Sequence, residues 1–504
     1  MTAVSSQDFL FIRNGSSVSL ADIPEFDFAA FRSMILEKIN FCRTEAFFAL
    51  PEKDGKYFLF IVLGDPEKKG LLIGKSPVKG AFESLSSSHA SFNRFEREIM
   101  EKYPDLVAEN HPNAKPLRFP GKEEVGVMDY FTMEGESVHE VAVGPVHAGV
   151  IEPGHFRFQC MGEKVYSLEI SLGYQHRDLE KMLVDGPDAK TSHLLETAAG
   201  DTSIASALNY SHIVETLAGL DVAESSVKVR QMALELERCA NHIGDLGALA
   251  GDVAFLPTAS FCGRIRGEYL NMTAELCGNR FGRNYIVPGG VRYSLDKEIA
   301  EKLLVWLKRV SKELWNALDL MFNSPTSLDR FENTGTVSCE TAKELGLTGM
   351  AARASGLYCD ARKDFPVEGD ITAKSVFEQE KTFCGNGDVF SRAFLRYCEL
   401  KMSHEFLFAA LEEFAAGHGE AEESERKCFP LKEETLAVSV TEAWRGELCH
   451  VAITDEKGRF RRYKVIDPSF HNWEGLAMAL RGEEISNFPI CNKSFNLSYC
   501  GHDL

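Results

Sequence analysis

The alternation of apolar and polar residues predicts β-strands in two parts of the chain. Tyr57 to Leu63 is an unbroken apolar run, and residues 70–73 form a shorter one, as expected of buried strands. Further along, residues 155–160 and 166–172 alternate between apolar and polar, with a plausible turn at residues 161–164 between them. Two alternating runs joined by a short turn predict a β-hairpin that buries one of its faces.

Apolar residues spaced three and four apart predict helices elsewhere. One such helix carries Phe92, Phe95 and Ile99 on one face and ends near Tyr103. The hydroxyl groups of Ser86 to Ser88 precede it and are candidate N-caps, because a serine oxygen can accept a first-turn N–H. Similar patterns predict helices at residues 227–250, 296–322 and 390–416, and strands again between residues 436 and 463.

Proline and other helix-breaking residues are concentrated between His111 and Gly121, and this stretch predicts a domain boundary. We expect two domains, residues 1–122 and residues 123–504. The first is a small α/β domain. The second is large and mainly helical, with a β-hairpin at its N-terminal end and strands near its C-terminal end, so that the whole chain is of the α+β class.

The chain has 504 residues, which is too long for one compact core and agrees with two domains. Its formal charge of −20 argues against a broad nucleic-acid surface, because such a surface needs an excess of lysine and arginine. The first residues do not resemble a signal peptide, and no run of about 18 apolar residues occurs. We expect a cytoplasmic protein without a membrane span.

Thirteen cysteines are present, and no two of them are three positions apart. The chain therefore lacks the C-x-x-C pairs of structural zinc sites, thioredoxin-type redox sites and local iron–sulfur sites. We interpret the cysteines as reduced thiols in a reducing compartment.

A polar stripe runs along the helix predicted at residues 227–250. Its members, at spacings of three and four on one helical face, are Glu235, Arg238, His242 and Asp245. Such a row can act as a proton relay, because carboxyl and imidazole groups donate and accept protons. The simpler interpretation is a surface or interhelical row of salt bridges, and the pattern alone favours it.

Three histidines flank the predicted hairpin, namely His147, His155 and His176. They could converge on a metal ion, but their spacing matches no local metal motif. Histidines scattered over turns and strand ends are the simpler interpretation.

Two further segments carry weaker signals. The glycine-bearing stretch 279–291 contains neither G-x-G-x-x-G nor a phosphate-binding lysine pattern, so it does not support nucleotide binding. It suits an interhelical loop whose backbone approaches another group closely. Near the C-terminus, Cys491, Cys500 and His502 suggest a metal site only weakly, because the two cysteines are far apart.

Several motifs, taken in order, resemble one family. Residues 144–158 resemble the opening hairpin of the large subunit of energy-converting, group 4 [NiFe] hydrogenases and of the homologous 49 kDa subunit of respiratory complex I. Residues 95–112 resemble the 30 kDa subunit of complex I. The resemblance covers nearly the whole chain and implies a fusion of the 30 kDa and 49 kDa types. Further motifs of the family lie at residues 173–181, 235–242, 279–290 and 329–335.

The chain departs from this family at the metal-binding positions. Catalytic members hold nickel through two C-x-x-C pairs, one near each end of the 49 kDa-like part. Here Ala199 and Thr202 stand at the first pair of positions, and Leu497 and Cys500 stand at the second. Alanine and leucine cannot ligate a metal, and one thiolate cannot hold nickel and iron. The resemblance therefore implies vestigial ligand positions and no metal bound by this chain.

Complex I subunits use the vacated pocket for quinone, and the resemblance implies a related cavity here. The family's quinone-contacting tyrosine falls near Gly200, and its hairpin histidine falls near Pro153, between His147 and His155. Arg445 resembles the family's arginine beside the cavity. The candidate quinone contacts are therefore His147, His155, Gly200 and Arg445. NAD binding and quinone binding are both associated with the family.

The leading hypothesis is a subunit of a membrane-associated, complex I-like or hydrogenase-related oxidoreductase. It would pass electrons to a small acceptor, with quinone as the candidate, in a metal-free cavity. An iron–sulfur small subunit would supply the cluster, and antiporter-like subunits would hold the chain at the inner face of the cell membrane. No nucleic-acid partner is expected. The alternatives are a [NiFe] hydrogenase catalytic subunit with unusual ligands and a purely scaffolding subunit.

Overall fold

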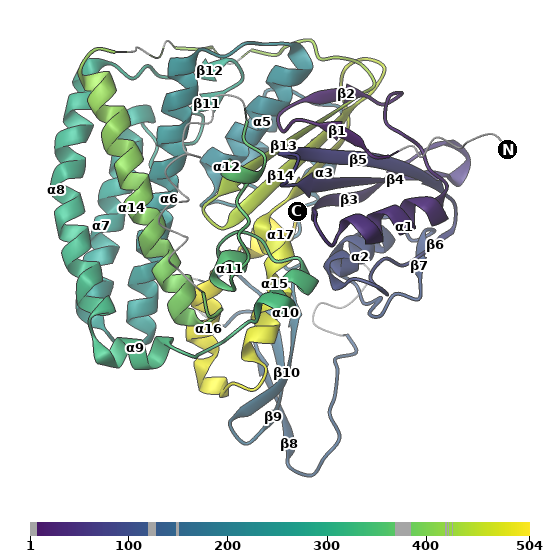
Figure 1. Ribbon diagram of the computed structural model, residues 1–504, viewed down its shortest axis with the longest axis horizontal. Helices are drawn as coiled ribbons and strands as arrows, with labels where there is room; N and C mark the ends of the chain where they lie inside the picture. The colour runs from purple at the N-terminus through teal and green to yellow at the C-terminus, as the bar shows by residue number, and fades with distance from the viewer. Residues whose placement is uncertain are drawn as a thin grey trace.

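The computed structural model describes residues 8–118, 128–147, 151–367, 385–418, 421, 423–425 and 427–504. The predicted boundary after residue 122 lies outside these ranges, and so do Ala148 to Val150 of the hairpin motif. The protein combines helices and strands and is of the α+β class, as the sequence predicts. A bundle of helices lies on one side, the N-terminal sheet lies on the other, and the C-terminal strands run between them (Figure 1).

The N-terminal part is built on an antiparallel sheet of four strands in the order β1-β5-β4-β3. Two helices pack against it, and Phe47, Ile61 and Ile73 are fully buried in the core. The strands predicted at residues 57–63 and 70–73 are confirmed as β4 and β5. The bounds are β1 (Leu10–Ile12), β3 (Arg43–Pro51), β4 (Tyr57–Asp65), β5 (Gly70–Val78), α1 (Phe28–Lys38) and α2 (Asn93–Lys102).

Helix α2 begins at Asn93, and the prediction that Ser86 to Ser88 cap it was wrong. Its N-cap residue is Phe92, which makes no side-chain capping bond. Ser86 instead donates through its hydroxyl group and its backbone N–H to the buried carboxylate of Glu96. A buried carboxylate must be hydrogen-bonded, so Ser86 donates to Glu96 instead of accepting a first-turn N–H at the helix end.

The second part is a bundle of long helices, and the helices predicted at residues 227–250, 296–322 and 390–416 are confirmed as α6, α8 and α14. Helix α6 lies in the middle of the bundle, in contact with α5, α7 and α14, and is buried on most of its circumference (Figure 1). The bounds are α5 (Ser203–Ala218), α6 (Glu224–Asp252), α7 (Leu256–Cys277), α8 (Lys297–Phe322) and α14 (Val389–Ala415).

The predicted hairpin and the C-terminal strands are both present, and each belongs to a larger sheet. The hairpin of β9 (His155–Met161) and β10 (Lys164–Ser171) pairs with β8 (Val138–Val143). The C-terminal strands form a sheet in the order β15-β14-β13-β2, in which the fourth strand comes from the N-terminal part of the chain. Its strands are β2 (Ser17–Ser19), β13 (Thr435–Ala443), β14 (Gly446–Thr454) and β15 (Phe460–Ile466).

Three short helices, α15 (Pro468–Leu480), α16 (Phe488–Phe495) and α17 (Tyr499–His502), follow the last strand. They return the C-terminus to the middle of the molecule, where Leu504 is buried (Figure 1). Among the helices that the structure describes, none is long and apolar enough to cross a membrane.

Candidate functional site

Arg445 connects three segments that are far apart in the sequence. It lies in the turn between β13 and β14, and its Nη1 and Nη2 each donate to the Asp201 carboxylate over 2.8 Å. Its Nε donates to the carbonyl oxygen of Asn496 over 2.6 Å. The loop before α5, the β13–β14 turn and the C-terminal segment therefore meet at one guanidinium group.

The pair of Arg445 and Asp201 is held in its ionised form. Burial by itself would lower the pKa of Arg445 and raise that of Asp201, but the opposite charge outweighs burial in both groups. The pKa of Arg445 is therefore raised and the pKa of Asp201 is lowered. The guanidinium carbon also lies 3.8 Å from the centre of the Trp444 ring. Two parallel hydrogen bonds and a stacked ring fix the orientation of Arg445.

The residues at the first three vestigial ligand positions offer nothing to a metal ion. Ala199 and Leu497 are buried and have no donor atom. The hydroxyl oxygen of Thr202 accepts from Trp444 Nε1 over 3.2 Å and from Arg445 Nη1 over 3.4 Å. Arg445 thus places a fixed positive charge next to Thr202, one of the predicted ligand positions.

Cys500 is the one cysteine at these four positions. Its Sγ lies 3.4 Å from the hydroxyl oxygen of Ser498, and burial, reinforced by Glu152, raises its pKa to about 12. It is therefore a neutral thiol in the metal-free chain, and a single cysteine cannot hold nickel and iron. The site does not fit a nickel–iron centre. In the part of the chain that the structure describes, no group of three or more His, Cys, Asp and Glu side chains is placed to hold a metal.

His147 lies beside the C-terminal segment. Its Nε2 is 3.4 Å from the Tyr499 hydroxyl oxygen, and its ring stacks on Phe156 at 5.5 Å between centres. Its Nδ1 is buried without a hydrogen-bond partner among the described residues, and burial lowers its pKa. A neutral imidazole next to a phenol can donate to or accept from a small polar ligand.

His155 and His176, two further histidines singled out in the sequence, each lie against a backbone carbonyl group. His155 Nδ1 is 3.3 Å from the carbonyl oxygen of Gly144, and His176 Nδ1 is 3.2 Å from that of Asp503. Gly200 is exposed in the loop that carries Asp201. The hydrogen bonds thus bring Arg445 to the Gly200 loop and bring His147 and His176 to the C-terminal segment, while His155 is bound to Gly144. Their roles as ligand contacts stay predictions.

Three residues of this region carry interactions that sequence reasoning missed. Asp201 pairs with Arg445 across 244 positions. Glu152 accepts the backbone N–H of Tyr499 over 3.2 Å and so connects the hairpin to the C-terminus. Asp201 and Tyr499 each adjoin a position that the sequence had singled out, which is the signal that could have found them.

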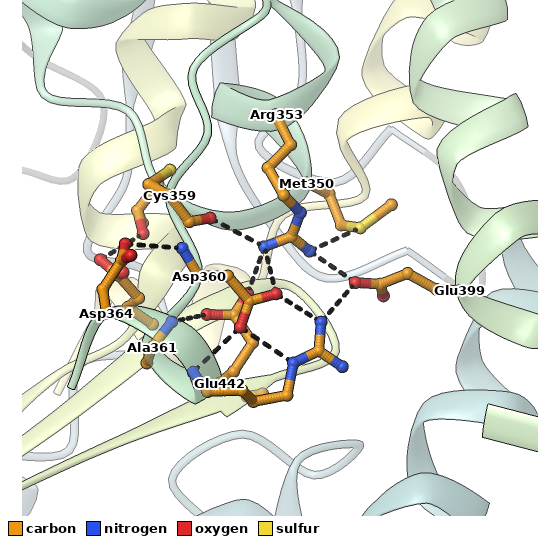
Figure 2. A network of polar contacts seen from close by, with 12 residues as sticks. Met350, Arg353, Cys359, Asp360, Ala361, Asp364, Glu399 and Glu442 are labelled. Atoms are coloured by element: carbon orange, nitrogen blue, oxygen red, sulfur yellow. Dashed lines mark hydrogen bonds and ion pairs between the residues drawn. The ribbon is translucent and has the colours of Figure 1, made fainter. Parts of the chain in front are cut away.

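The polar stripe of α6 is an interhelical network, completely covered by neighbouring elements. Arg238 pairs with Glu235 over 3.0 Å, and His242 Nε2 lies 2.7 Å from Glu399 of α14. Asp245 pairs with Arg396 of α14 over 2.9 Å. The salt-bridge interpretation is confirmed in its interhelical form. Figure 2 shows how Glu399 continues into a larger group of arginine and carboxyl side chains.

The stretch 279–291 connects α7 to α8 and its backbone is approached closely, as predicted, but it also contains a short pair of strands, β11 (Ile286–Val287) and β12 (Gly290–Val291). The buried guanidinium of Arg230 donates to the carbonyl oxygens of Gly290 over 2.9 Å and Val287 over 2.7 Å. At the C-terminus, His502 lies 2.9 Å from Asp503, and Cys491 is a buried thiol.

The profile of the family described as respiratory-chain NADH dehydrogenase, 49 Kd subunit, matches residues 252–503, which is half of the chain. The chain belongs to this family. Its resemblance to the 49 kDa subunit of complex I and to group 4 hydrogenase large subunits is thereby confirmed, and it is a subunit of that related group.

Curated relatives come from both branches of this group. The carbon monoxide-induced hydrogenase of Rhodospirillum rubrum is 28% identical over 71% of this chain and 98% of that protein. The membrane-bound hydrogenase subunit alpha of Pyrococcus furiosus is 27% identical over 71% of this chain and 85% of that protein. The D-type subunit of the NADH-quinone oxidoreductase of Thermus thermophilus is 28% identical over 68% of this chain and 88% of that protein.

Proposed function

We propose that this chain is the metal-free large subunit of an oxidoreductase complex related to complex I and group 4 hydrogenases. Electrons reach it from an iron–sulfur cluster in a partner small subunit and pass to a small acceptor of the quinone class. The observation that carries the proposal is the bidentate pair of Arg445 and Asp201, which stands beside Thr202 where the family's metal would need a thiolate.

The surroundings of the pair suit an uncharged carbonyl acceptor. His147 and Tyr499 lie side by side at the C-terminal segment, and each can hydrogen-bond a carbonyl oxygen. Relatives named as subunits of NADH-quinone oxidoreductase support the choice of quinone, and the relative named membrane-bound hydrogenase subunit alpha supports a membrane partner. Antiporter-like subunits would hold the chain at the inner face of the cell membrane.

Metal analysis of the purified complex tests the absence of a nickel–iron centre. We expect no stoichiometric nickel, and no change in metal content in a Cys500→Ser variant. Stoichiometric nickel that disappears in the Cys500→Ser variant would contradict the proposal and favour an unusual hydrogenase. Proteins that co-purify identify the iron–sulfur and membrane partners.

Inhibition by quinone analogues tests the acceptor. We expect His147→Ala and Tyr499→Phe each to raise the concentration of analogue needed for half inhibition by about tenfold, because one hydrogen bond to a buried group contributes on the order of 1.4 kcal/mol. His139→Ala, at an exposed histidine of β8, is the matched control. A complex that quinone analogues neither protect nor inhibit would favour a scaffolding role instead.

A further inference from the structure

Seven carboxyl groups and four guanidinium groups lie in one network next to the candidate site. The seven carboxyl side chains are at most 5% exposed and come from both parts of the chain. They belong to Glu45, Glu235, Asp360, Asp364, Glu399, Glu442 and Glu447, and the guanidinium groups belong to Arg43, Arg238, Arg353 and Arg362.

The centre of this network is closely hydrogen-bonded (Figure 2). Arg353, on α11 (Gly349–Ala354), donates to Glu442 over 2.7 Å and to Glu399 over 2.6 Å. Arg362, on α12 (Ala361–Asp364), donates to Asp360 and also to Glu399 over 3.0 Å. Glu442 and Glu399 are therefore joined through one guanidinium group.

The charges of the network do not balance if every group is ionised. Seven carboxylates face four guanidinium groups, so three negative charges remain. A positive charge on His242 would still leave two. The neighbouring Arg396 is already paired with Asp245. Each uncompensated charge in such a buried place costs several kcal/mol, and buried carboxyl groups avoid that cost by keeping their protons.

Two members of the network are placed to hold those protons. Glu45 Oε1 is buried and has no hydrogen-bond partner among the described residues, a position that suits a protonated carboxyl. Burial, with Asp360 adding to it, raises the pKa of Glu442 to about 7. The charged groups that face Glu442 are Arg353, Asp360, Arg362, Asp364, Glu399, Glu447, Glu45 and Arg43, with Arg238 bound to its backbone carbonyl.

Glu399 differs from Glu45 and Glu442 in the direction of its pKa shift. Burial by itself would raise its pKa, but Arg353, Arg238 and Arg362 hold that pKa well below its ordinary value. Burial also lowers the pKa of His242, whose Nε2 lies 2.7 Å from Glu399. A neutral imidazole that donates through Nε2 to a carboxylate has its lone pair on Nδ1.

The network extends from a cavity to the candidate site. The cavity has a volume of about 490 Å³, and the residues that line it include the exposed Asp221 and the buried Glu235 and Glu442. At the other end, the buried His242 Nδ1 has no hydrogen-bond partner among the described residues. The His242 ring lies 6.2 Å from the ring of Trp444, whose Nε1 donates to the Asp201 carbonyl over 3.1 Å.

We infer that this network stores protons on Glu45 and Glu442 and exchanges them with water in the cavity. Each proton released from Glu442 leaves a carboxylate beside Arg353, and water in the cavity reprotonates it.

Infrared spectroscopy of the purified full-length protein tests the store. A protonated carboxyl group absorbs apart from carboxylates, and its band shifts in heavy water. We expect this band at pH about 7, with separate losses of intensity in Glu442→Gln and Glu45→Gln. Glu412→Gln, at a carboxylate 59% exposed, is the matched control and should leave the band unchanged. Circular dichroism confirms that each variant is folded. The store is overturned if the band is absent or is the same in every variant.

Discussion

Two groups of charges lie at the two ends of one short segment, and they differ in burial and in charge balance. Arg445 pairs one to one with Asp201, whose side chain is 34% exposed. Glu442, three residues earlier, belongs to a network in which carboxyl groups outnumber guanidinium groups and most members are fully buried. A balanced pair can stay ionised and fix the positions of the segments that it joins. In an acid-rich network, some of the carboxyl groups have to stay protonated.

The largest effect that we expect comes from removing the charge of Glu399. Glu399→Gln leaves Arg353, Arg362 and Arg238 with one counter-charge fewer in a region without solvent. We expect the free energy of unfolding to fall by about 3–5 kcal/mol, measured by denaturant titration of the purified chain. Glu412→Gln is the control. A loss below about 1 kcal/mol would mean that water reaches the network and screens its charges.

Arg445→Met should have an intermediate effect. It leaves Asp201 without its partner, but the exposed part of that carboxylate can be solvated. We therefore expect a loss of about 1–2 kcal/mol, smaller than that of Glu399→Gln. Arg461→Met, which removes a surface pair with Glu52, is the matched control and should cost less. Equal losses for Arg445→Met and Glu399→Gln would remove the distinction between the two groups.

The smallest effect is that of Glu442→Gln at pH about 5, where we expect a change of about 1 kcal/mol or less, because glutamine resembles the protonated acid. The pKa of Glu442 is raised in the folded state to about 7 from an ordinary 4.5. The unfolded chain therefore releases this proton first, and the stability of the wild type falls as pH rises towards 7. The Glu442→Gln variant has no carboxyl group at this position and so lacks this pH-dependent loss of stability.

The difference between Glu442→Gln and the wild type should thus grow in favour of the variant between pH about 5 and about 7 and then level off. Melting temperatures across this range measure it, with Glu412→Gln as the reference. A difference that does not depend on pH would show that Glu442 is ionised throughout and that the proton is held elsewhere.

The local pattern of residues was sufficient for most elements of the fold. The apolar run at residues 57–63, the alternation around residue 162 and the helical spacing at 227–250 each reappear as β4, the β9–β10 hairpin and α6. These patterns are readable because their period is set by the backbone itself, within a few neighbouring residues. The family motifs were likewise readable from the order of residues.

The capping of α2 was not readable, because the hydroxyl group of Ser86 could either accept a first-turn N–H or donate to a carboxylate. It binds the carboxylate of Glu96, ten positions away, and leaves Phe92 at the helix end. Similarly, the spacing of Glu235, Arg238 and His242 identifies a helical face but cannot say which element will cover that face. Helix α14 covers it, and an exposed row of charges becomes a buried network.

The sequence by itself determined the class of the fold and the family, and it predicted Ala199, Thr202 and Leu497 at the positions of metal-binding thiols. Only the tertiary structure decided which side chains surround these positions. Asp201 and Arg445 are 244 positions apart, and β2 joins β13 from the opposite end of the chain. Such pairs arise when distant segments pack against one core, and they depend on the sum of many contacts, which no local pattern records.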